Sequence, residues 1–334
     1  MNNKVSLVTG GAGFIGSHVV DTLIAKGHKV IVLDDLSGGF TQNVNPKAIW
    51  VQGSILNESL LDSLFIEHGI QYIFHLAAYA AEGLSHFIRK FNYENNLIGS
   101  INLINRAVKY ECKHLVFTSS IAVYGANQVP MTEAMKPEPE DPYGISKYAV
   151  EMDLKAAEKM FGLPYTIFRP HNVYGERQNY GDTYRNVIGI FINNMMQGKP
   201  MTIFGDGKQK RAFSYIQDVA PYIAEAIDTP KAKNETFNVG ADTSHTVLDI
   251  ASLVAKGLDK EPKITYLPAR KEVVDAFSDH RKLKQVFSTT PEVSLEIGLQ
   301  KMIEWCVAVG PRVTKKFTGI EVDKNMPPSW KALT

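Results

Sequence analysis

The chain has 334 residues, of which 44% are hydrophobic, and a formal net charge of +1 at pH 7. This length is typical of two domains or one large α/β unit, and the near balance of charge gives no electrostatic case for a nucleic-acid partner or an anionic membrane. The two cysteines, Cys112 and Cys306, are isolated, which argues against a disulfide framework and fits a reducing compartment. We find no signal-peptide pattern, no apolar run that could span a bilayer and no metal-spaced histidine cluster, and so expect a cytoplasmic protein without a bound metal.

Six short apolar runs have the pattern of strands that are buried on both faces. They cover residues 4–10, 29–35, 48–53, 72–78, 114–120 and 165–170. Helical patterns such as IGSHVVDTLIAKG and LIGSINLINRAVKY lie between several of them. Alternating strands and helices imply right-handed crossovers, and they predict an α/β fold with a doubly wound parallel sheet of the Rossmann type.

A glycine-rich turn, TGGAGFIGSH, joins the first strand to the first helix. Gly10 permits a tight turn, Gly13 lets the backbone approach a pyrophosphate, and Gly16 lets the helix pack closely on the sheet. The second strand ends in Asp34, whose carboxylate can accept hydrogen bonds from both adenosine ribose hydroxyls and would repel a 2′-phosphate. The sequence therefore predicts NAD rather than NADP. For the adjacent Asp35, a solvated turn-capping role is an alternative to cofactor binding.

Three residues at the carboxyl edge of the expected sheet indicate hydride-transfer chemistry. Ser120 ends the strand at 114–120, and Tyr143 and Lys147 lie four residues apart on one face of a helix that begins after Pro142. A Tyr–x–x–x–Lys pair alone is common on surface helices, but the dinucleotide-binding turn favours a catalytic role. A phenol titrates near ~10, and the Lys147 ammonium and a cationic nicotinamide both favour its phenolate form. Ser120 can bridge Tyr143 to a substrate hydroxyl, and Lys147 can also hold the nicotinamide ribose.

The strand–helix rhythm changes beyond Arg169, where Tyr, Asn, Gly and Arg become frequent. We expect an NAD-binding domain over residues 1–168 and a smaller, mixed α/β substrate domain over residues 169–310, with some interleaving of elements. Residues 311–334, which contain three prolines and no clear period, have the character of a C-terminal extension.

Several motifs together resemble the extended short-chain dehydrogenase/reductase family, in particular its nucleotide-sugar epimerases such as the UDP-galactose and UDP-N-acetylglucosamine 4-epimerases. The resemblance extends to about residue 310. It rests on TGGAGFIGSH, HLAA at 75–78, NLIGSINLI from Asn96, TSSIAVYG, PYGISK, RPHNVYG at 169–175 and GDGKQKRAFSYIQD at 205–218.

The resemblance implies a UDP-sugar substrate and a set of binding residues. Asn172 would contact the substrate, and Arg211 and Arg270 would clamp the diphosphate, for which guanidinium groups are well suited. Arg270 departs from the family because it lacks the frequent Pro–Gly–Asp that follows, and Ser54 stands where epimerases commonly have an adenine-binding Asp. The expected cofactor contacts are Gly10, Gly13, Phe14, Ile15, Gly16, Asp34, Asp35, Ser54, Ile55, Leu76, Ala77, Ala78, Asn96, Tyr143, Lys147 and Arg169.

Ile121 and Ala122 stand where related dehydratases and decarboxylases carry acidic residues. Neither side chain can transfer a proton, so the sequence favours epimerisation at carbon 4 through a transient 4-keto sugar, with the hydride taken up and returned by NAD. The alternatives are a UDP-glucuronate epimerase, a ketoreductase, or an inactive NAD-sensing regulator. The ketoreductases usually release NADP, which Asp34 disfavours, and a regulator would not need Ser120, Tyr143 and Lys147 together.

A residue three positions before the Asp of a D-x-x-K segment helps in this family to gate the pocket beside carbon 2 of the sugar. Counting from Asp279 places Ala276 at the gate, whereas counting from Arg270 places Phe277 there. The small Ala276 would admit an N-acetyl group. We therefore expect UDP-N-acetylglucosamine and UDP-N-acetylgalactosamine as substrates, together with UDP-glucose and UDP-galactose.

The helix that begins near Ile145 has two apolar stripes. One consists of Ile145, Ala149, Met152, Ala156 and Met160, and the other of Val150, Leu154 and Ala157. One stripe can cover the sheet and the second needs another partner, unless both face one wide core. We expect a homodimer that packs through the helices near 96–109 and 145–160.

Overall fold

The computed structural model describes residues 4–126, 128–182, 184–269, 275–288, 292–313 and 317–331. Its larger part is a seven-stranded, fully parallel sheet with the order β11-β6-β5-β4-β1-β2-β3. These strands are β1 (Val5–Thr9), β2 (Lys29–Asp34), β3 (Ile49–Gln52), β4 (Tyr72–His75), β5 (His114–Thr118), β6 (Tyr165–Pro170) and β11 (Glu235–Val239). The predicted doubly wound α/β fold is confirmed.

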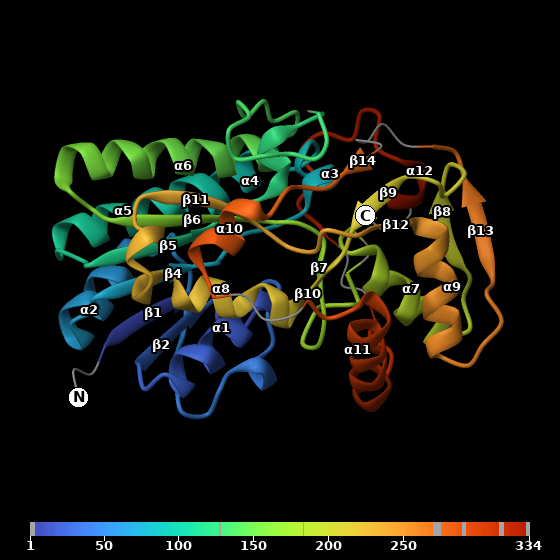
Figure 1. Ribbon diagram of the computed structural model, residues 1–334, viewed down its shortest axis with the longest axis horizontal. Coiled ribbons are helices and arrows are strands. Elements are labelled where there is room, and N and C mark those ends of the chain that lie inside the picture. The colour runs from blue at the N-terminus through green and yellow to red at the C-terminus, as the bar shows by residue number, and fades with distance from the viewer. Residues whose placement is uncertain are drawn as a thin grey trace.

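The apolar runs form strands because both faces of the sheet are covered. Successive residues point to opposite faces, so that Leu7 packs with one helical layer and Val8 with the other. Helices α2 (Glu58–His68), α5 (Gly99–Lys109) and α6 (Pro142–Phe161) cover one face, and α1 (Phe14–Ala25) and α8 (Ala220–Glu225) cover the other. In Figure 1, α6 runs along the top of the larger part and α1 lies low in the view.

The smaller part of the molecule, on the right in Figure 1, packs three helices beside short strands. The helices are α7 (Val187–Met196), α9 (Val247–Gly257) and α11 (Leu295–Val309). The strands are β7 (Val173–Tyr174), β8 (Met201–Phe204), β9 (Lys210–Ala212), β10 (Ser214–Tyr215), β12 (Ser244–Thr246), β13 (Ile264–Leu267) and β14 (Asp275–Ala276). The remaining helices are α3 (Glu82–Ser85), α4 (Arg89–Tyr93), α10 (Arg281–Val286) and α12 (Pro328–Lys331).

The chain passes between the two parts more than once. The expected boundary between residues 168 and 169 falls inside β6, and β11 later returns to pair with β6 at the edge of the large sheet. Helix α8 packs against α1 beneath the same sheet. Residues 311–313 and 317–331 of the expected extension lie against the rest of the molecule, with Met326 and Trp330 buried.

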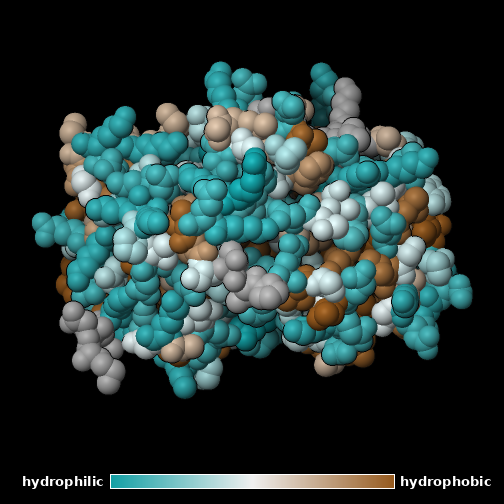
Figure 2. All heavy atoms as spheres, in the orientation of Figure 1, coloured by the Kyte–Doolittle hydropathy of each residue, from teal (hydrophilic) through white to brown (hydrophobic). Residues whose placement is uncertain are grey.

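The face shown in Figure 2 is mostly hydrophilic, and its hydrophobic residues gather mainly over the smaller part. No helix of the described ranges is both long enough and apolar enough to cross a membrane.

Candidate active site

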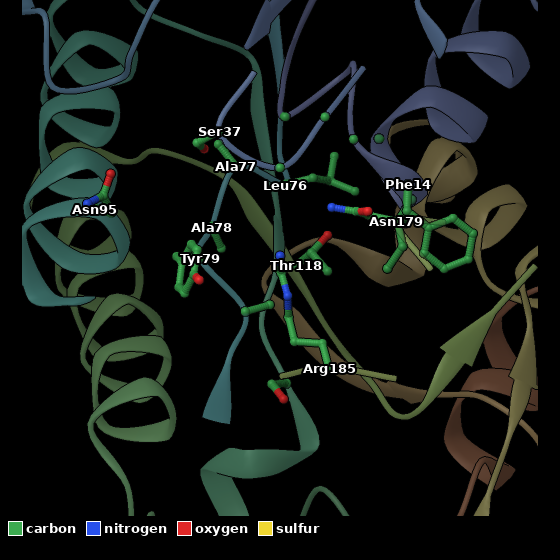
Figure 3. A pocket seen from close by; sticks show the side chains of 18 of the residues that line it. Phe14, Ser37, Leu76, Ala77, Ala78, Tyr79, Asn95, Thr118, Asn179 and Arg185 are labelled. Carbon is green, nitrogen blue, oxygen red and sulfur yellow. The ribbon is translucent and has the colours of Figure 1, made fainter. Parts of the chain in front are cut away.

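A cavity of about 350 Å³ opens at the carboxyl ends of the central strands. This is the edge at which open parallel sheets bind ligands, and the size suits a small-molecule site. Its wall comes from the glycine turn, the ends of β2, β4 and β5, the start of α6 and the segment after β6. Figure 3 shows Phe14, Leu76, Ala77, Ala78 and Thr118 around it.

The glycine turn is shaped by close backbone approaches. Gly10 has φ of 72°, and a Cβ on it would lie 2.7 Å from the backbone nitrogen of Ala77. A Cβ on Gly16 would lie 2.1 Å from the carbonyl oxygen of Gly10, so helix α1 can approach the turn only with glycine there. The turn and the start of α1 thus leave the bare backbone that a pyrophosphate group needs.

Asp34 closes the cavity beside this turn. Its carboxylate is buried and accepts hydrogen bonds from the backbone N–H groups of Ala12 (3.1 Å) and Leu36 (2.8 Å). Burial raises the pKa of Asp34 above its usual value, and the two N–H groups act in the opposite direction. Asp34 faces the cavity as an acceptor for hydroxyl groups, which fits the ribose of NAD.

Most of the other expected cofactor contacts also line the cavity. They are Gly13, Phe14, Ile15, Asp35, Ser54, Ile55, Leu76, Ala77 and Ala78. Two expected contacts are not among its lining residues. Asn96 is buried, and its amide group bonds both the backbone N–H (2.7 Å) and the carbonyl (3.1 Å) of Tyr79. Arg169 is buried in an ion pair with Glu151, at 2.5 Å.

Ser120, Tyr143 and Lys147 meet on the floor of the cavity. Ser120 precedes a short 3₁₀ turn, Ile121–Tyr124, and its hydroxyl accepts a hydrogen bond from the N–H of Ala122 at 3.1 Å. Tyr143 lies in the first turn of α6, which Asp141 caps by accepting a hydrogen bond from Gly144 N–H at 2.9 Å. The cap and Pro142 fix where the helix begins.

The electrostatics of the pair are unusual because both side chains are deeply buried. Burial raises the pKa of the Tyr143 phenol, while a hydrogen bond with Ser120 lowers it. Burial lowers the pKa of the Lys147 ammonium to about 7, and the Glu151 carboxylate opposes that shift. Lys147 Nζ donates to the carbonyl of Thr118 at 2.8 Å, which fixes its position beside the phenol ring.

Ile121 lines the cavity and Ala122 is buried beside it, so neither supplies a proton-transfer group. A carboxylate that sequence reasoning did not identify does reach the cavity: Glu82, from the segment after β4, lines it, and its charge raises the pKa of Tyr143. Tyr79, Asn95, Asn179 and Arg185 were also missed, because the segments that carry them have no motif of their own.

A second cavity of about 360 Å³ adjoins the first within the described part of the molecule. Both are lined by Asn172, Val173, Arg185 and Asn186, so these residues mark their junction. The second cavity also contains Arg211 and a set of aromatic residues. These are Tyr174, Tyr184, Phe191, Phe204, Phe213 and Trp330.

The expected substrate residues do not all line the two cavities. Asn172 has φ of 40° and donates through its side-chain amide to the carbonyl of Ala212 at 3.1 Å. Ala276 pairs with Arg211 in the β14–β9 ladder, but neither Ala276 nor Phe277 is among the residues that line the two cavities. Arg270 lies outside the described residues. Across the described ranges, no group of three or more His, Cys, Asp or Glu residues could hold a metal ion.

The sequence matches the NAD dependent epimerase/dehydratase family over residues 6–240. The chain belongs to this family. A putative UDP-glucose 4-epimerase from Methanocaldococcus jannaschii is 36% identical over 90% of this chain and 97% of its own. Membership in the family confirms the resemblance inferred from the motifs and the use of NAD.

Solved structures of the family agree with the fold. A UDP-glucose 4-epimerase from Thermotoga maritima, with UDP-glucose, superposes with a TM-score of 0.86 at 38% identity and covers 90% of this chain and 98% of its own. A UDP-N-acetylglucosamine 4-epimerase from Methanobrevibacter ruminantium gives a TM-score of 0.86 at 30% identity over 92% and 100%. A UDP-glucuronic acid 4-epimerase from Bacillus cereus, with UDP-glucuronic acid and NAD, gives 0.84 at 29% over 91% and 99%. Family members of nearly the same length thus act on different UDP-sugars.

Proposed function

We propose that this protein is an NAD-dependent epimerase that inverts carbon 4 of a UDP-hexose. The observation that carries the proposal is the meeting of Ser120, Tyr143 and Lys147 beside the glycine turn, with Ile121 and Ala122 in place of acidic residues. Such a site can oxidise an alcohol and reduce the resulting ketone. The similarity of this protein to UDP-sugar 4-epimerases supports this reaction.

Tyr143, Ser120 and Lys147 have separate roles in the proposed reaction. Tyr143 takes the proton of the sugar 4-hydroxyl as its phenolate, and returns it after the 4-keto sugar has turned its other face. Ser120 holds that hydroxyl through the hydrogen bond it shares with Tyr143. Lys147, when charged, stabilises the phenolate and can reach the nicotinamide ribose. NAD, when bound along the glycine turn and Asp34, supplies the hydride acceptor and donor.

For the sugar, we propose UDP-N-acetylglucosamine and UDP-N-acetylgalactosamine, with UDP-glucose and UDP-galactose also accepted. The proposal of an open gate at carbon 2 relies on the small side chain of Ala276 at the position counted from Asp279, and Ala276 pairs with Arg211, which lines the second cavity. The UDP-N-acetylglucosamine 4-epimerase among the similar structures also supports it.

A second candidate substrate is UDP-glucuronate, and Arg185 favours it. Arg185 lines both cavities, and Figure 3 shows its side chain reaching into the first between Tyr79 and Asn179. Its guanidinium is held by Asp182, with Nε at 2.7 Å from the carboxylate, and lies 5.0 Å from the Tyr79 ring centre. The Arg185 charge acts on Tyr143 in the same cavity by lowering its pKa, and a guanidinium in that position is suited to a sugar carboxylate.

Turnover of a panel of UDP-sugars, with products separated, tests the reaction and the substrate together. Tyr143→Phe should lower kcat by several orders of magnitude and leave UDP-sugar binding intact, because it removes the proton acceptor and keeps the ring. Tyr148→Phe, five residues along the same helix, is the matched control and should retain activity. Near-normal turnover by Tyr143→Phe would contradict the mechanism.

Two further variants separate the substrates. Ala276→Tyr should reduce kcat/KM far more for the N-acetylated pair than for UDP-glucose and UDP-galactose. Arg185→Met should reduce kcat/KM at least ~10-fold for UDP-glucuronate and much less for neutral sugars, since it removes one charged hydrogen-bonding partner. A wild-type enzyme that turns over only UDP-glucuronate would reject the N-acetylhexosamine proposal.

We also propose that the protein is a cytoplasmic homodimer. The stripe of Val150, Leu154 and Ala157 is buried against the sheet, whereas Ile145, Met152 and Met160 on the other stripe are 40%, 50% and 75% exposed. Ile98, at the start of the neighbouring helix, is 46% exposed. An apolar face of this kind supports association through α5 and α6. The cytoplasmic location rests on the sequence alone, with the buried free thiols Cys112 and Cys306 in keeping with it.

A further inference from the structure

Residues 317–331 form a strap, so called from here on, that lies across the segment between β4 and α5. Phe317 packs its ring against Tyr79 and Phe91, with ring centres 5.4 and 5.2 Å apart. Met326 and Trp330 are buried in one hydrophobic cluster with Ala81, Leu84 and Ile88. The strap thus buries apolar side chains against the back of a segment that lines the first cavity.

Hydrogen bonds fix the position of the strap along that segment. The Glu321 carboxylate accepts from the backbone N–H groups of Lys90 (2.7 Å) and Phe91 (2.8 Å). The backbone N–H groups of Glu321 and Val322 donate to the carbonyl of Phe87, at 2.8 and 3.2 Å. Carboxylate-to-amide bonds of this kind are strong and directional, so they set the register in which the strap docks.

Trp330 extends from the strap into the wall of the second cavity. Only 5% of it is exposed, and its ring lies edge-on to Tyr184, with centres 5.3 Å apart. It also approaches Gly83 so closely that a Cβ there would lie 3.1 Å from the indole Cη2. Trp330 therefore contacts Tyr184, which lines the second cavity, and Gly83, which follows a residue of the first.

Trp330 lines the second cavity, and these contacts bring it close to the junction with the first. Its partner Tyr184 precedes Arg185, which lines both cavities, and Gly83 follows Glu82, which lines the first. A nucleotide sugar that presents its carbon 4 to Tyr143 in the first cavity, and its diphosphate to Arg211 in the second, must place its hexose at this junction.

We propose that the strap completes the sugar-binding site and that Trp330 is a specificity-determining residue that contacts the hexose of the substrate. An indole ring offers a large, rigid apolar surface against which the apolar face of a pyranose can pack. Because Arg211 lines the same cavity as Trp330, the test must separate a contact with the hexose from a contact with the nucleotide. This inference rests on the proposed function, since it takes the orientation of the UDP-sugar from that reaction.

The test compares ligands with and without the hexose. In the NAD-loaded enzyme, Trp330→Ala should raise KM and the dissociation constant for UDP-glucose about 10-fold and leave kcat within about threefold, while the affinity for UDP changes less than twofold. Trp330→Phe should restore most of the loss, because it keeps an aromatic surface. Equal losses for UDP and UDP-glucose, or no loss for either, would overturn the proposal.

A second measurement does not require Trp330 to be replaced. The chain has three tryptophans, so the Trp50→Phe/Trp305→Phe variant leaves Trp330 as the only one. Its emission should respond to UDP-glucose and much less to UDP, and equal responses would overturn the assignment. If the proposed function is wrong, the wild-type protein will bind UDP-sugars without inverting carbon 4. The binding measurements would then still test whether Trp330 contacts the hexose.

Discussion

Tyr143 and Lys147, the residues proposed to react, have protonation preferences that oppose the proposed reaction while the site is empty. Burial disfavours the charged forms of both Tyr143 and Lys147, so the empty site favours a neutral phenol and lowers the ammonium pKa to about 7. A bound cationic nicotinamide stabilises the phenolate, and the Glu151 carboxylate supports the ammonium. In the proposed reaction, the proton acceptor should therefore form more readily once NAD is bound.

Replacing Asp34 by Asn should weaken NAD binding and relax the discrimination against NADP. The change removes the charge that repels a 2′-phosphate and a charged acceptor for the ribose hydroxyls, a loss of about 1.5–3 kcal/mol, or ~10–100-fold in affinity. The measurement is the dissociation constant of each cofactor for the stripped enzyme. Asp35→Asn is the comparison, because Asp35 accepts a hydrogen bond from Ser37 N–H and should matter less. Release of NADP from denatured wild-type protein would contradict this reading of Asp34.

His75 should make stability depend on pH. It is fully buried between the hydroxyls of Thr9 (2.7 Å) and Ser100 (2.8 Å), and burial lowers its pKa to about 3. Between pH ~6.5 and ~3 the unfolded chain therefore binds a proton that the folded protein excludes, so His75 lowers stability as pH falls. At pH 5 this amounts to roughly 2 kcal/mol.

Urea unfolding at pH 7 and pH 5 measures this effect. His75→Gln should cost stability at pH 7, where its polar contacts are changed, and the difference from wild type should shrink by roughly 2 kcal/mol at pH 5. The comparison with wild type cancels groups that titrate in the same range, such as Asp218, whose pKa burial raises to about 6. An unchanged difference at the two pH values would show that His75 is protonated in the folded protein.

At the scale of elements, α6 carries both Tyr143 and Lys147, and it also forms buried polar contacts with β6 and with the end of β5. Glu151 on α6 bonds Arg169 on β6 at 2.9 and 2.5 Å, and it accepts from the Ser119 hydroxyl at 2.6 Å. Arg169 also donates to the Tyr124 hydroxyl at 2.7 Å, next to the cavity floor. The network holds Lys147, one turn away, against the end of β5.

The partners of the buried side chains in this network could not be predicted from the sequence. Motifs placed Arg169 and Asn96 near the cofactor because they follow recognisable strands or begin recognisable helices. Whether such a side chain turns into the cavity or behind its wall depends on partners far along the chain, such as Glu151 for Arg169 and Tyr79 for Asn96. The meeting of the glycine turn, Ser120, Tyr143 and Lys147 was predictable because each follows a strand of one parallel sheet, whose carboxyl ends lie at one edge.

Replacing one member of the buried Arg169–Glu151 ion pair should lower the free energy of unfolding more than replacing both. Arg169→Leu leaves the Glu151 carboxylate buried without its ion-pair partner and should cost about 3–5 kcal/mol of the free energy of unfolding. Arg169→Leu/Glu151→Leu should recover part of that loss, since no uncompensated charge remains. Chemical denaturation of Arg169→Leu, Glu151→Leu and the double variant measures the three costs. A double variant as unstable as the sum of the single ones would contradict a coupled pair.

At the scale of the whole molecule, the sequence predicted the six central strands but not the seventh. Residues 235–239 form β11 at the sheet edge, beyond a long excursion into the smaller part, and no local pattern tells a strand which sheet it will join. The same limit applies to the strap. Its proline-containing sequence has no clear period, and only the tertiary contacts of Glu321 and Trp330 bring it to the site.

In the proposed dimer, one apolar stripe of α6 covers the sheet and the other packs against a second copy of the chain. If α5 and α6 pack against a second copy, Ile98→Glu/Met152→Glu should place charges in an apolar interface and yield a monomer, because buried unpaired charges cost several kcal/mol. Both side chains are about half exposed, so the fold should survive the change. Ile66→Glu is the matched control: Ile66 is 72% exposed on α2, which is not one of the two proposed interface helices, and this variant should remain dimeric. Sedimentation velocity at micromolar concentration separates the species, and a monomeric wild type, or a double variant that stays dimeric, would refute the arrangement.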